Sequence, residues 1–326
     1  MMGQPFSKMK FVVTKYTKQT IISVFTDYFV FKFSNFGASI IGLTYKNVEM
    51  VLSPRNIDDV FEKDYFYGKT IGAIANRVEN GKVIIDNKTF QMRLNEGNNS
   101  HHGGPNGISN KLFDYFVDEE EGKIVFIYKK KDLEDGLPGN IEYKITYKIS
   151  NKLRVEFEAI SDKNTIVSLT NHTFFCLKEK NVNAFTLKAN CDRYVETNPD
   201  NLLPLKASNI PNFLDFRNGL ALKTFIDIPL FQSSKAKGYD HDLIFTKEGC
   251  NQIFLEDSKS QLIIETDFPS FQIYSDNYEN KYKFIDVKLN KRSSLAIEPC
   301  DILTDRKILK ANELYRRFIE YTIKEK

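Results

Sequence analysis

The chain contains no tryptophan, and its 326 residues include only four histidines and four cysteines. The cysteines, Cys176, Cys191, Cys250 and Cys300, form no C-x-x-C pair. This scatter argues against a zinc ribbon or a disulfide scaffold and favours free thiols in a reducing compartment. We therefore expect a cytoplasmic protein.

Long apolar segments and an excess of charge of one sign are also missing. No uninterrupted apolar run is long enough to span a bilayer, and the first residues lack the apolar stretch of a secretion signal. The formal net charge is only +3, with 46 basic and 43 acidic residues interspersed. We thus expect no nucleic-acid or membrane partner but a small molecule, bound by a monomer or a homodimer.

What the chain has in quantity is short segments of Val, Ile, Phe and Tyr at alternating spacing, which predict an antiparallel all-β protein. Residues 82–92 are typical of a hairpin with its turn at Asp86-Asn87-Lys88. The other expected strands are residues 10–17, 28–33, 38–45, 123–128, 141–149, 153–160, 184–188, 242–246, 252–255, 261–266, 270–274 and 294–297.

Helical patterns are scarce, and residues 57–66 alone suggest a short helix or turn. The last segment is ambiguous, because Leu314 and Phe318 fit a helical spacing whereas Tyr315 and Ile319 fit an alternating one. No Pro/Gly linker and no repeat divides the chain. We expect one domain of stacked sheets over residues 1–326, with residues 1–9 as a flexible start.

The histidines occupy three short polar segments, which we expect to meet in one site. His101 and His102 precede Gly103 and Gly104 in a loop. Neighbours in an extended backbone point to opposite sides, so one of the two histidines should face the site. The glycines would let this loop close against a ligand without side chains in the way.

The other two histidines are ambiguous from the residues alone. His172 follows an apolar run and is flanked by polar residues that can orient its ring, but a core histidine with backbone partners fits the same pattern. His241 lies in Asp240-His241-Asp242, and the same alternation of charges is also typical of a solvated turn. The sequence therefore leaves both a functional and a structural interpretation open for these segments.

Two further residues suggest chemistry. Glu298 ends an apolar strand, where partial desolvation would raise its pKa and make it a stronger base; a strand-end glutamate paired with a lysine is the alternative. Asn76-Arg77 lies in a run of small and apolar residues, which favours a buried guanidinium with bidentate contacts over a surface ion pair. Two chemical interpretations follow. Histidines and carboxylates could hold a metal in a β-scaffold, for which the missing H-x-H and H-x-x-E spacings give only weak support, or an imidazole and a carboxylate could act as a metal-free acid and base pair.

Taken in order, these segments resemble the aldose 1-epimerase (mutarotase) family. The similarity rests on an A-N-R…N-G motif, an N-x-x-H-G-G motif, an N-H-T-aromatic-F motif and a D-H pair, and it covers most of the chain. The matching segments are residues 35–43, 72–81, 98–104, 135–140, 170–175, 238–241 and 295–298.

The resemblance implies a galactose mutarotase-like antiparallel β-supersandwich with few short helices, whose cleft binds a monosaccharide, and it makes the last segment a strand. It also implies an isomerase that interconverts the α and β anomers of free aldohexoses such as galactose or glucose, without a cofactor or metal. Glu298 matches the general base of the family and His172 the general acid. His102, Arg77, Asp240 and Asn76 match substrate-binding positions, whereas His101 and His241 receive no role.

The chain also departs from the family pattern. Pro299-Cys300 follow the expected base where Thr-Gln is common, and Phe113 lies near the position of a usual tryptophan, so Phe or Tyr would have to stack on the sugar. A hexose-6-phosphate 1-epimerase of the same fold and a non-catalytic sugar-binding module remain alternatives. A cluster of arginines would favour the first, whereas retention of both Glu298 and His172 argues against the second.

Overall fold

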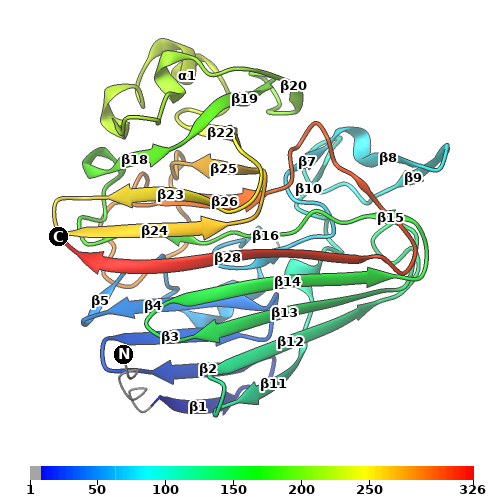
Figure 1. The fold of residues 1–326 in the computed structure, drawn as a ribbon, viewed down its shortest axis with the longest axis horizontal. Helices are drawn as coiled ribbons and strands as arrows, with labels where there is room; N and C mark the ends of the chain where they lie inside the picture. Colours follow the sequence, from blue (N-terminus) through cyan, green and yellow to red (C-terminus); the bar gives the residue numbers. More distant parts are fainter. Residues whose placement is uncertain (1–8, 63) are drawn as a thin grey trace.

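The computed structural model describes residues 9–62 and 64–326, and it consists almost wholly of antiparallel β-strands (Figure 1). The all-β expectation is therefore confirmed. Residues 1–8 of the expected flexible start lie outside the described residues, and Met9 packs partly buried against the core. No helix in the described part of the chain is long and apolar enough to cross a membrane.

A nine-stranded antiparallel sheet is the largest element, and its strands lie one above another in Figure 1 with the long β28 in the middle. Inward-facing residues alternate along its strands, as Leu153, Val155 and Phe157 do in β14. In spatial order the strands are β11 (Asp114–Asp118), β12 (Lys123–Lys130), β13 (Ile141–Ile149), β14 (Leu153–Ser161), β28 (Leu314–Glu325), β24 (Ser260–Thr266), β23 (Asn251–Glu256), β18 (Thr186–Ala189) and β21 (Leu220–Ala221).

Two further sheets complete the main architecture. The five-stranded one comprises β1 (Lys10–Lys15), β2 (Thr20–Phe25), β3 (Phe29–Ser34), β4 (Ser39–Tyr45) and β5 (Val48–Glu49). The six-stranded one has the order β17 (Phe174–Phe175), β26 (Leu295–Cys300), β25 (Ser270–Tyr274), β22 (Asp240–Phe245), β19 (Cys191–Thr197) and β20 (Pro204–Asn209).

Short two-stranded ladders connect these sheets. They pair β6 (Thr70–Ile71) with β16 (Thr170–Asn171), β7 (Arg77–Val78) with β10 (Ser100–His101), β8 (Lys82–Ile85) with β9 (Lys88–Gln91), and β15 (Thr165–Ile166) with β27 (Ile308–Leu309). The β8–β9 pair is the expected hairpin. Asp86 and Asn87 both have positive φ, as a two-residue turn of this kind requires.

Helical structure is confined to short pieces of the described residues. The α-helix α1 spans Pro229–Ser233, and the segment expected as a helix or turn forms the 3-10 helix η1, Ile57–Phe61. The remaining 3-10 turns are η2 (Glu79–Gly81), η3 (Ile108–Asn110), η4 (Val182–Ala184), η5 (Asn212–Leu214) and η6 (Leu222–Thr224). The ambiguous last segment is strand β28, because Ile319, Tyr321 and Ile323 point inward at alternating positions.

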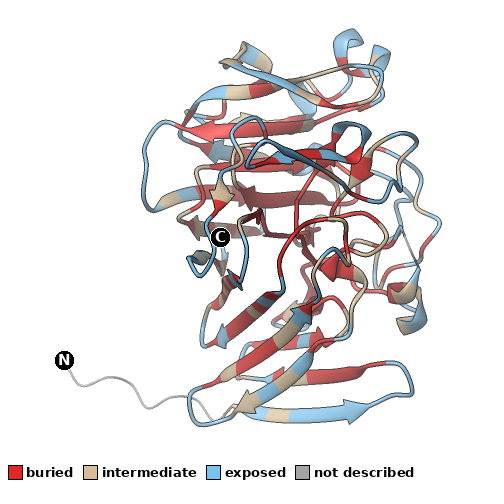
Figure 2. Cartoon of the chain, turned by 90° about the vertical axis from the view of Figure 1, so that its right-hand side faces the viewer, coloured by how far each residue is buried: buried red, intermediate tan, exposed pale blue. Residues whose placement is uncertain are grey.

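The main hydrophobic core contains residues from all three large sheets, among them Phe31 from β3, Phe157 from β14 and Phe271 from β25. Figure 2 shows these buried strand interiors in red, with exposed residues along the outer edges and loops. Apolar burial of this extent is the dominant stabilising contribution to a fold of stacked sheets. It also supplies a rigid frame for the loops at one side of the molecule.

A buried ion pair organises the loop between β12 and β13. Lys130 Nζ lies 2.7 Å from Asp135 Oδ1, and both side chains are 2% exposed. The same ammonium donates to the Leu137 carbonyl at 2.8 Å, and Asp135 Oδ1 accepts from the Leu137 amide at 2.9 Å. The charges are thus hydrogen-bonded as well as paired, as buried charges must be.

This pair generates a stability prediction. Asp135→Asn leaves the Lys130 ammonium buried without its counter-charge, which destabilises the fold by about 3 kcal/mol. The control is Glu142→Gln, which breaks the exposed Lys129–Glu142 pair between the same two strands and changes stability by less than about 1 kcal/mol. Urea denaturation measures both, and equal effects of the two substitutions would contradict the prediction.

Candidate active site

All six residues predicted for the site line one cavity of about 300 Å³, namely Glu298, His172, His102, Arg77, Asp240 and Asn76. They come from the six-stranded sheet, from the segment between β16 and β17, and from the β7–β10 ladder with its adjoining loops. Segments more than two hundred residues apart in the chain therefore meet at one wall of the fold.

The six-stranded sheet positions the acidic wall of the cavity. Its register sets Gln272 on β25 opposite both Asp242 on β22 and Glu298 on β26. Because side chains alternate along a strand, Asp240, Gln272 and Glu298 share one face. Gln272 holds this row together by donating from Nε2 to Asp240 Oδ1 at 2.5 Å.

Glu298 is 4% exposed, and its strand accommodates the unusual Pro299-Cys300 sequence. On one side β17 pairs with β26 only at Leu295 and Ala296, so at Pro299 the strand has a partner on its other side alone. A missing backbone N–H is tolerated at such a position. Cys300 lies against Asp242, with its Sγ 3.6 Å from Oδ1.

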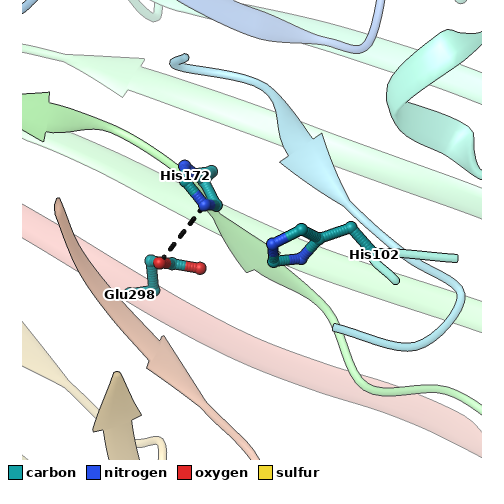
Figure 3. A group of neighbouring side chains, drawn as sticks. All are labelled: His102, His172 and Glu298. Atoms are coloured by element: carbon teal, nitrogen blue, oxygen red, sulfur yellow. Dashed lines mark ion pairs between the residues drawn. The ribbon is translucent and has the colours of Figure 1, made fainter. Parts of the chain in front are cut away.

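His172 follows β16 and is held by its own backbone. Its N–H donates to the Lys69 carbonyl at 2.9 Å, and its carbonyl accepts from the Gly68 amide at 2.8 Å. The ring then reaches across the cavity, where Nε2 lies 3.4 Å from Glu298 Oε1 (Figure 3). Nδ1 has no hydrogen-bond partner within the described residues. His172 therefore faces Glu298 rather than serving as a satisfied core histidine.

The expectation that only one residue of the His101-His102 pair faces the site is wrong. Both line the cavity, and their ring centroids are 3.8 Å apart. The reason is that the backbone is not extended at this point: β10 ends at His101, and His102 has φ 53. A left-handed residue breaks the alternation that would turn neighbouring side chains apart.

The glycines after His102 also have a different purpose from the one expected. Neither lines the cavity. A Cβ on Gly103 would lie 2.1 Å from the Gly72 carbonyl oxygen, and one on Gly104 would lie 2.6 Å from that of Arg93. The two glycines let the backbone after His102 pack closely against the backbone at Gly72 and Arg93, and this packing fixes the position of His102.

Asn76 and Arg77 form the opposite wall. Asn76 adopts φ 62, and its Oδ1 accepts from the Arg77 amide at 2.7 Å. The Arg77 side chain is only 10% exposed, and its Nε and Nη2 donate to the two carboxylate oxygens of Glu96 at 2.7 and 2.9 Å. The guanidinium is thus buried and bidentate, as its sequence setting predicts.

Arg306 supports this wall from outside the cavity. Its Nη2 donates to the Ala75 carbonyl at 3.0 Å and lies 3.4 Å from the Arg77 carbonyl. These contacts tie the segment after β26 to the backbone on either side of Asn76. The acidic wall and the Arg77 wall are therefore held at a set separation.

Burial controls the electrostatics of the site. It lowers the pKa of His172 to about 4, and it lowers the pKa of His102 well below the ordinary imidazole value. Burial, followed by the neighbouring Asp240 and Asp242 charges, raises the pKa of Glu298 well above its ordinary value, although Arg77 opposes this. Burial thus favours the neutral form of both groups.

Proximity and desolvation act in opposite directions on Glu298 and His172. Opposite charges do favour each other, but here desolvation of the two buried groups outweighs their attraction across 3.4 Å. A ligand that replaces the lost solvation of either group would shift its pKa back toward the ordinary value.

The Asp240-His241-Asp242 segment divides its side chains between two environments. Asp240 lines the cavity, where burial raises its pKa and Arg77 lowers it. His241 points to the other face of β22, where it packs against Phe231 and accepts from the Asp240 amide at its Nδ1. In the third histidine segment, Asp240 thus lines the cavity, whereas His241 is a core residue.

Aromatic side chains supply the apolar surface of the cavity. Phe66, Tyr67, Phe174, Tyr274 and Tyr278 all line it. Phe113, which lies near the position of the usual tryptophan, is instead buried against Tyr128. Any stacking on a sugar falls to Phe or Tyr, as the lack of tryptophan implies.

Among the residues that make polar contacts in or behind the walls of the site, Gln272, Glu96 and Arg306 escaped the sequence reasoning. Gln272 had a usable signal, because it is polar at the centre of the otherwise apolar Phe271–Ile273 stretch of an expected strand. Glu96 and Arg306 had none, since isolated charges in polar loops are indistinguishable from solvated ones. Their contacts with Arg77 and its backbone arise between segments distant in sequence.

A metal is the chemical alternative for part of this site. Donor atoms of His102, His172 and Glu298 lie within 4.8 Å of one another, and two imidazoles with a carboxylate suit zinc. In a tetrahedral zinc centre such atoms would be roughly 3.4 Å apart. The observed separation of up to 4.8 Å would also accommodate a sugar hydroxyl between these side chains. Elemental analysis of the purified protein decides between a bound metal and a metal-free site.

The burial of the histidines predicts their titration. In NMR spectra of ¹⁵N-labelled protein, none of the four imidazoles should show a midpoint near 6.5, because burial lowers the pKa of His172 and His241 to about 4 and those of His101 and His102 well below the ordinary value. Because burial lowers these pKa values, each imidazole should gain its second proton only at a lower pH than an exposed histidine does. A site histidine titrating at 6 to 7 would contradict the buried geometry.

Solved structures share this architecture. Galactose 1-epimerase from Lactobacillus acidophilus NCFM is similar with a TM-score of 0.86 and 24% identity, over 98% of this chain and 99% of that one. The GalM/aldose epimerase homologue from C. elegans has a TM-score of 0.80 and 27% identity, over 97% of this chain and 99% of that one. The galactose mutarotase-like fold is therefore present.

Characterised relatives agree at the sequence level. Aldose 1-epimerase of Escherichia coli (strain K12) is 28% identical over 233 residues, which is 65% of this chain and 64% of that protein's length. Galactose mutarotase of Sus scrofa is 26% identical over 71% of this chain and 68% of its own length. The aldose 1-epimerase family model matches residues 21–322. The chain belongs to the aldose 1-epimerase family.

Proposed function

We propose that this protein is an aldose 1-epimerase, an isomerase that interconverts the α and β anomers of free aldohexoses of the galactose or glucose type. The observation that carries this proposal is the His172–Glu298 pair, 3.4 Å apart at the wall of a cavity that also contains His102, Arg77 and Asp240. Positioned acid and base groups are what opening a hemiacetal requires.

In the proposed reaction, Glu298 removes the proton from the hydroxyl on C1 while His172 delivers one to the ring oxygen. The bond between C1 and the ring oxygen breaks and a carbonyl forms at C1. Rotation about the C1–C2 bond presents the other carbonyl face, and the reverse transfers close the ring. His102, Asn76, Arg77 and Asp240 hold the sugar oxygens, and no cofactor or metal enters these steps.

The shifted pKa values of His172 and Glu298 bear on this cycle. Ring opening moves one proton to Glu298 and takes one from His172, so the open-chain sugar is accompanied by protonated Glu298 and neutral His172. Burial favours this distribution before any sugar binds. The site is thus electrostatically matched to the open-chain intermediate, and the hydroxyls of a bound pyranose would stabilise the alternative, charged distribution.

The charge of the cavity weighs against the phosphorylated-sugar alternative. A hexose-6-phosphate 1-epimerase needs a cluster of cations, but Arg77 is already paired with Glu96 and Lys235 is the remaining lysine among the lining residues. A non-catalytic sugar-binding module would not need the facing acid and base. Free sugars and catalysis are therefore the better supported assignments.

We also propose that residues 1–326 form a single domain that acts in the cytoplasm on a monosaccharide. A core shared by the three large sheets supports the first point. Cys176, Cys191, Cys250 and Cys300 are all free thiols, which supports a reducing compartment.

Polarimetry tests the function. Freshly dissolved α-D-galactose and α-D-glucose should equilibrate faster with wild type than with buffer, and Glu298→Gln and His172→Asn should each lower the rate by about 10² to 10⁴-fold because each removes one proton-transfer group. His241→Gln, on the other face of β22, is the matched control. No acceleration by wild type would end the enzymatic proposal, and full activity of both site variants would end the role assignment.

The pH dependence of the rate tests the shared proton. The proposed reaction needs one proton shared by His172 and Glu298. Burial lowers the pKa of His172 to about 4, where the pair would gain a second proton, and raises the pKa of Glu298, above which the pair would lose the first. After subtraction of the buffer rate, kcat/KM of the enzyme should stay level as pH falls through 6.5 and decline near 4. A decline centred at 6.5 would mean that His172 titrates as an ordinary exposed imidazole.

A further inference from the structure

The cavity has more carboxyl groups than lysine and arginine side chains. Its lining residues include the bases Arg77 and Lys235 and the acids Asp64, Glu96, Asp240 and Glu298. Asp240 and Glu298 belong to the proposed sugar-binding and proton-transfer groups, and Asp64 is paired with Lys281 at 2.7 Å on the exposed rim. Glu96 is the acid to which neither the fold nor the proposed reaction assigns a purpose.

Glu96 lies beside both the arginine and the lysine that line the cavity. Its Oε2 accepts from Arg77 Nε at 2.7 Å, and its Oε1 accepts from Arg77 Nη2 at 2.9 Å. Lys235 Nζ lies 3.9 Å from the same Oε1. The planar fork of a guanidinium is the group that binds a carboxylate or phosphate bidentately. In this chain that fork is already taken by a carboxylate of the protein.

The loop that carries Glu96 does not need this side chain for its shape. Asn95 closes the loop through its own side chain, which accepts from the His101 amide at 2.7 Å and donates to the His101 carbonyl at 2.9 Å. The Asn99 amide donates to the Glu96 carbonyl at 2.9 Å. The Glu96 carboxylate is therefore free to act on the charge of the cavity without being required for the turn.

We propose that Glu96 determines the charge specificity of the site, an inference that rests on the proposed function. Glu96 occupies the guanidinium of Arg77 and lies beside Lys235. Uncharged aldoses are therefore accepted, whereas sugars that bear a carboxylate or a phosphate are rejected. A bound anion would have to displace Glu96 and then remain beside Asp240 and Glu298. Without the Glu96 charge, Arg77 and Lys235 together form a two-cation site for such an anion.

Titration calorimetry with D-galactose and D-galacturonate tests this proposal. The two sugars differ only in a carboxylate at C6, and the proteins are wild type, Glu96→Gln, Glu96→Asp and Asp64→Asn. In Glu96→Gln the affinity for galacturonate, relative to galactose, should rise on the order of tenfold or more, as expected for new charge-assisted hydrogen bonds. Glu96→Asp keeps the charge and should reject galacturonate as wild type does.

Asp64→Asn is the matched control, because it removes one negative charge from the same cavity without releasing Arg77. Its relative affinity should change by less than about fivefold, as for an exposed ion pair. The proposal would be overturned if wild type bound galacturonate with the same affinity as galactose. It would also be overturned if Glu96→Gln and Asp64→Asn raised the relative affinity for galacturonate equally. An unchanged ratio in a Glu96→Gln protein that is folded by circular dichroism would overturn it as well.

Two further outcomes separate this inference from the proposed function. If wild type binds no galactose, the proposed function fails, and the galacturonate affinities of wild type and Glu96→Gln still decide the role of Glu96 by themselves. If Glu96→Gln does not fold, Glu96→Ser removes the same charge from the loop, and the same comparison applies to it.

Discussion

The structure of this site depends on the burial of an acid and a base that face each other. Glu298 is 4% exposed and His172 is 8% exposed, so water stabilises neither charge. Desolvation favours the neutral form of each group, whereas in water a glutamate is ionised near neutral pH and a histidine is partly protonated. A polar ligand between them changes the solvation of both groups, and with it the pKa of each.

The fold maintains this burial by bringing rigid walls together. The six-stranded sheet sets Asp240, Gln272 and Glu298 on one face through its register, and the backbone of the β16–β17 segment fixes His172 opposite them. Arg306 then ties the segment after β26 to the carbonyls beside Asn76. None of these walls is a site alone. Catalytic geometry at this scale needs side chains that the surrounding packing holds in place.

Much of the architecture follows from alternation of apolar residues, because a strand with one buried face must repeat every second residue. Strands such as β13, β14, β24 and β25 were predictable in this way. The end segment was not, since Leu314 and Phe318 also fit a helix, and pairing with β14 and β24 decides for a strand. The orientation of His101 was mispredicted because a single left-handed residue, His102, cannot be identified from an extended pattern.

By itself the sequence determined the all-β class and, through its motifs, the family and the six residues that meet in the cavity. Those features are local, because they depend on residue type and on spacing along the chain. The tertiary structure alone decided the shifted pKa values of His172 and Glu298, the contact of Gln272 with Asp240 and the pairing of Glu96 with Arg77. Each of these depends on desolvation or on contacts between segments far apart in the chain, and neither quantity exists until the sheets have packed.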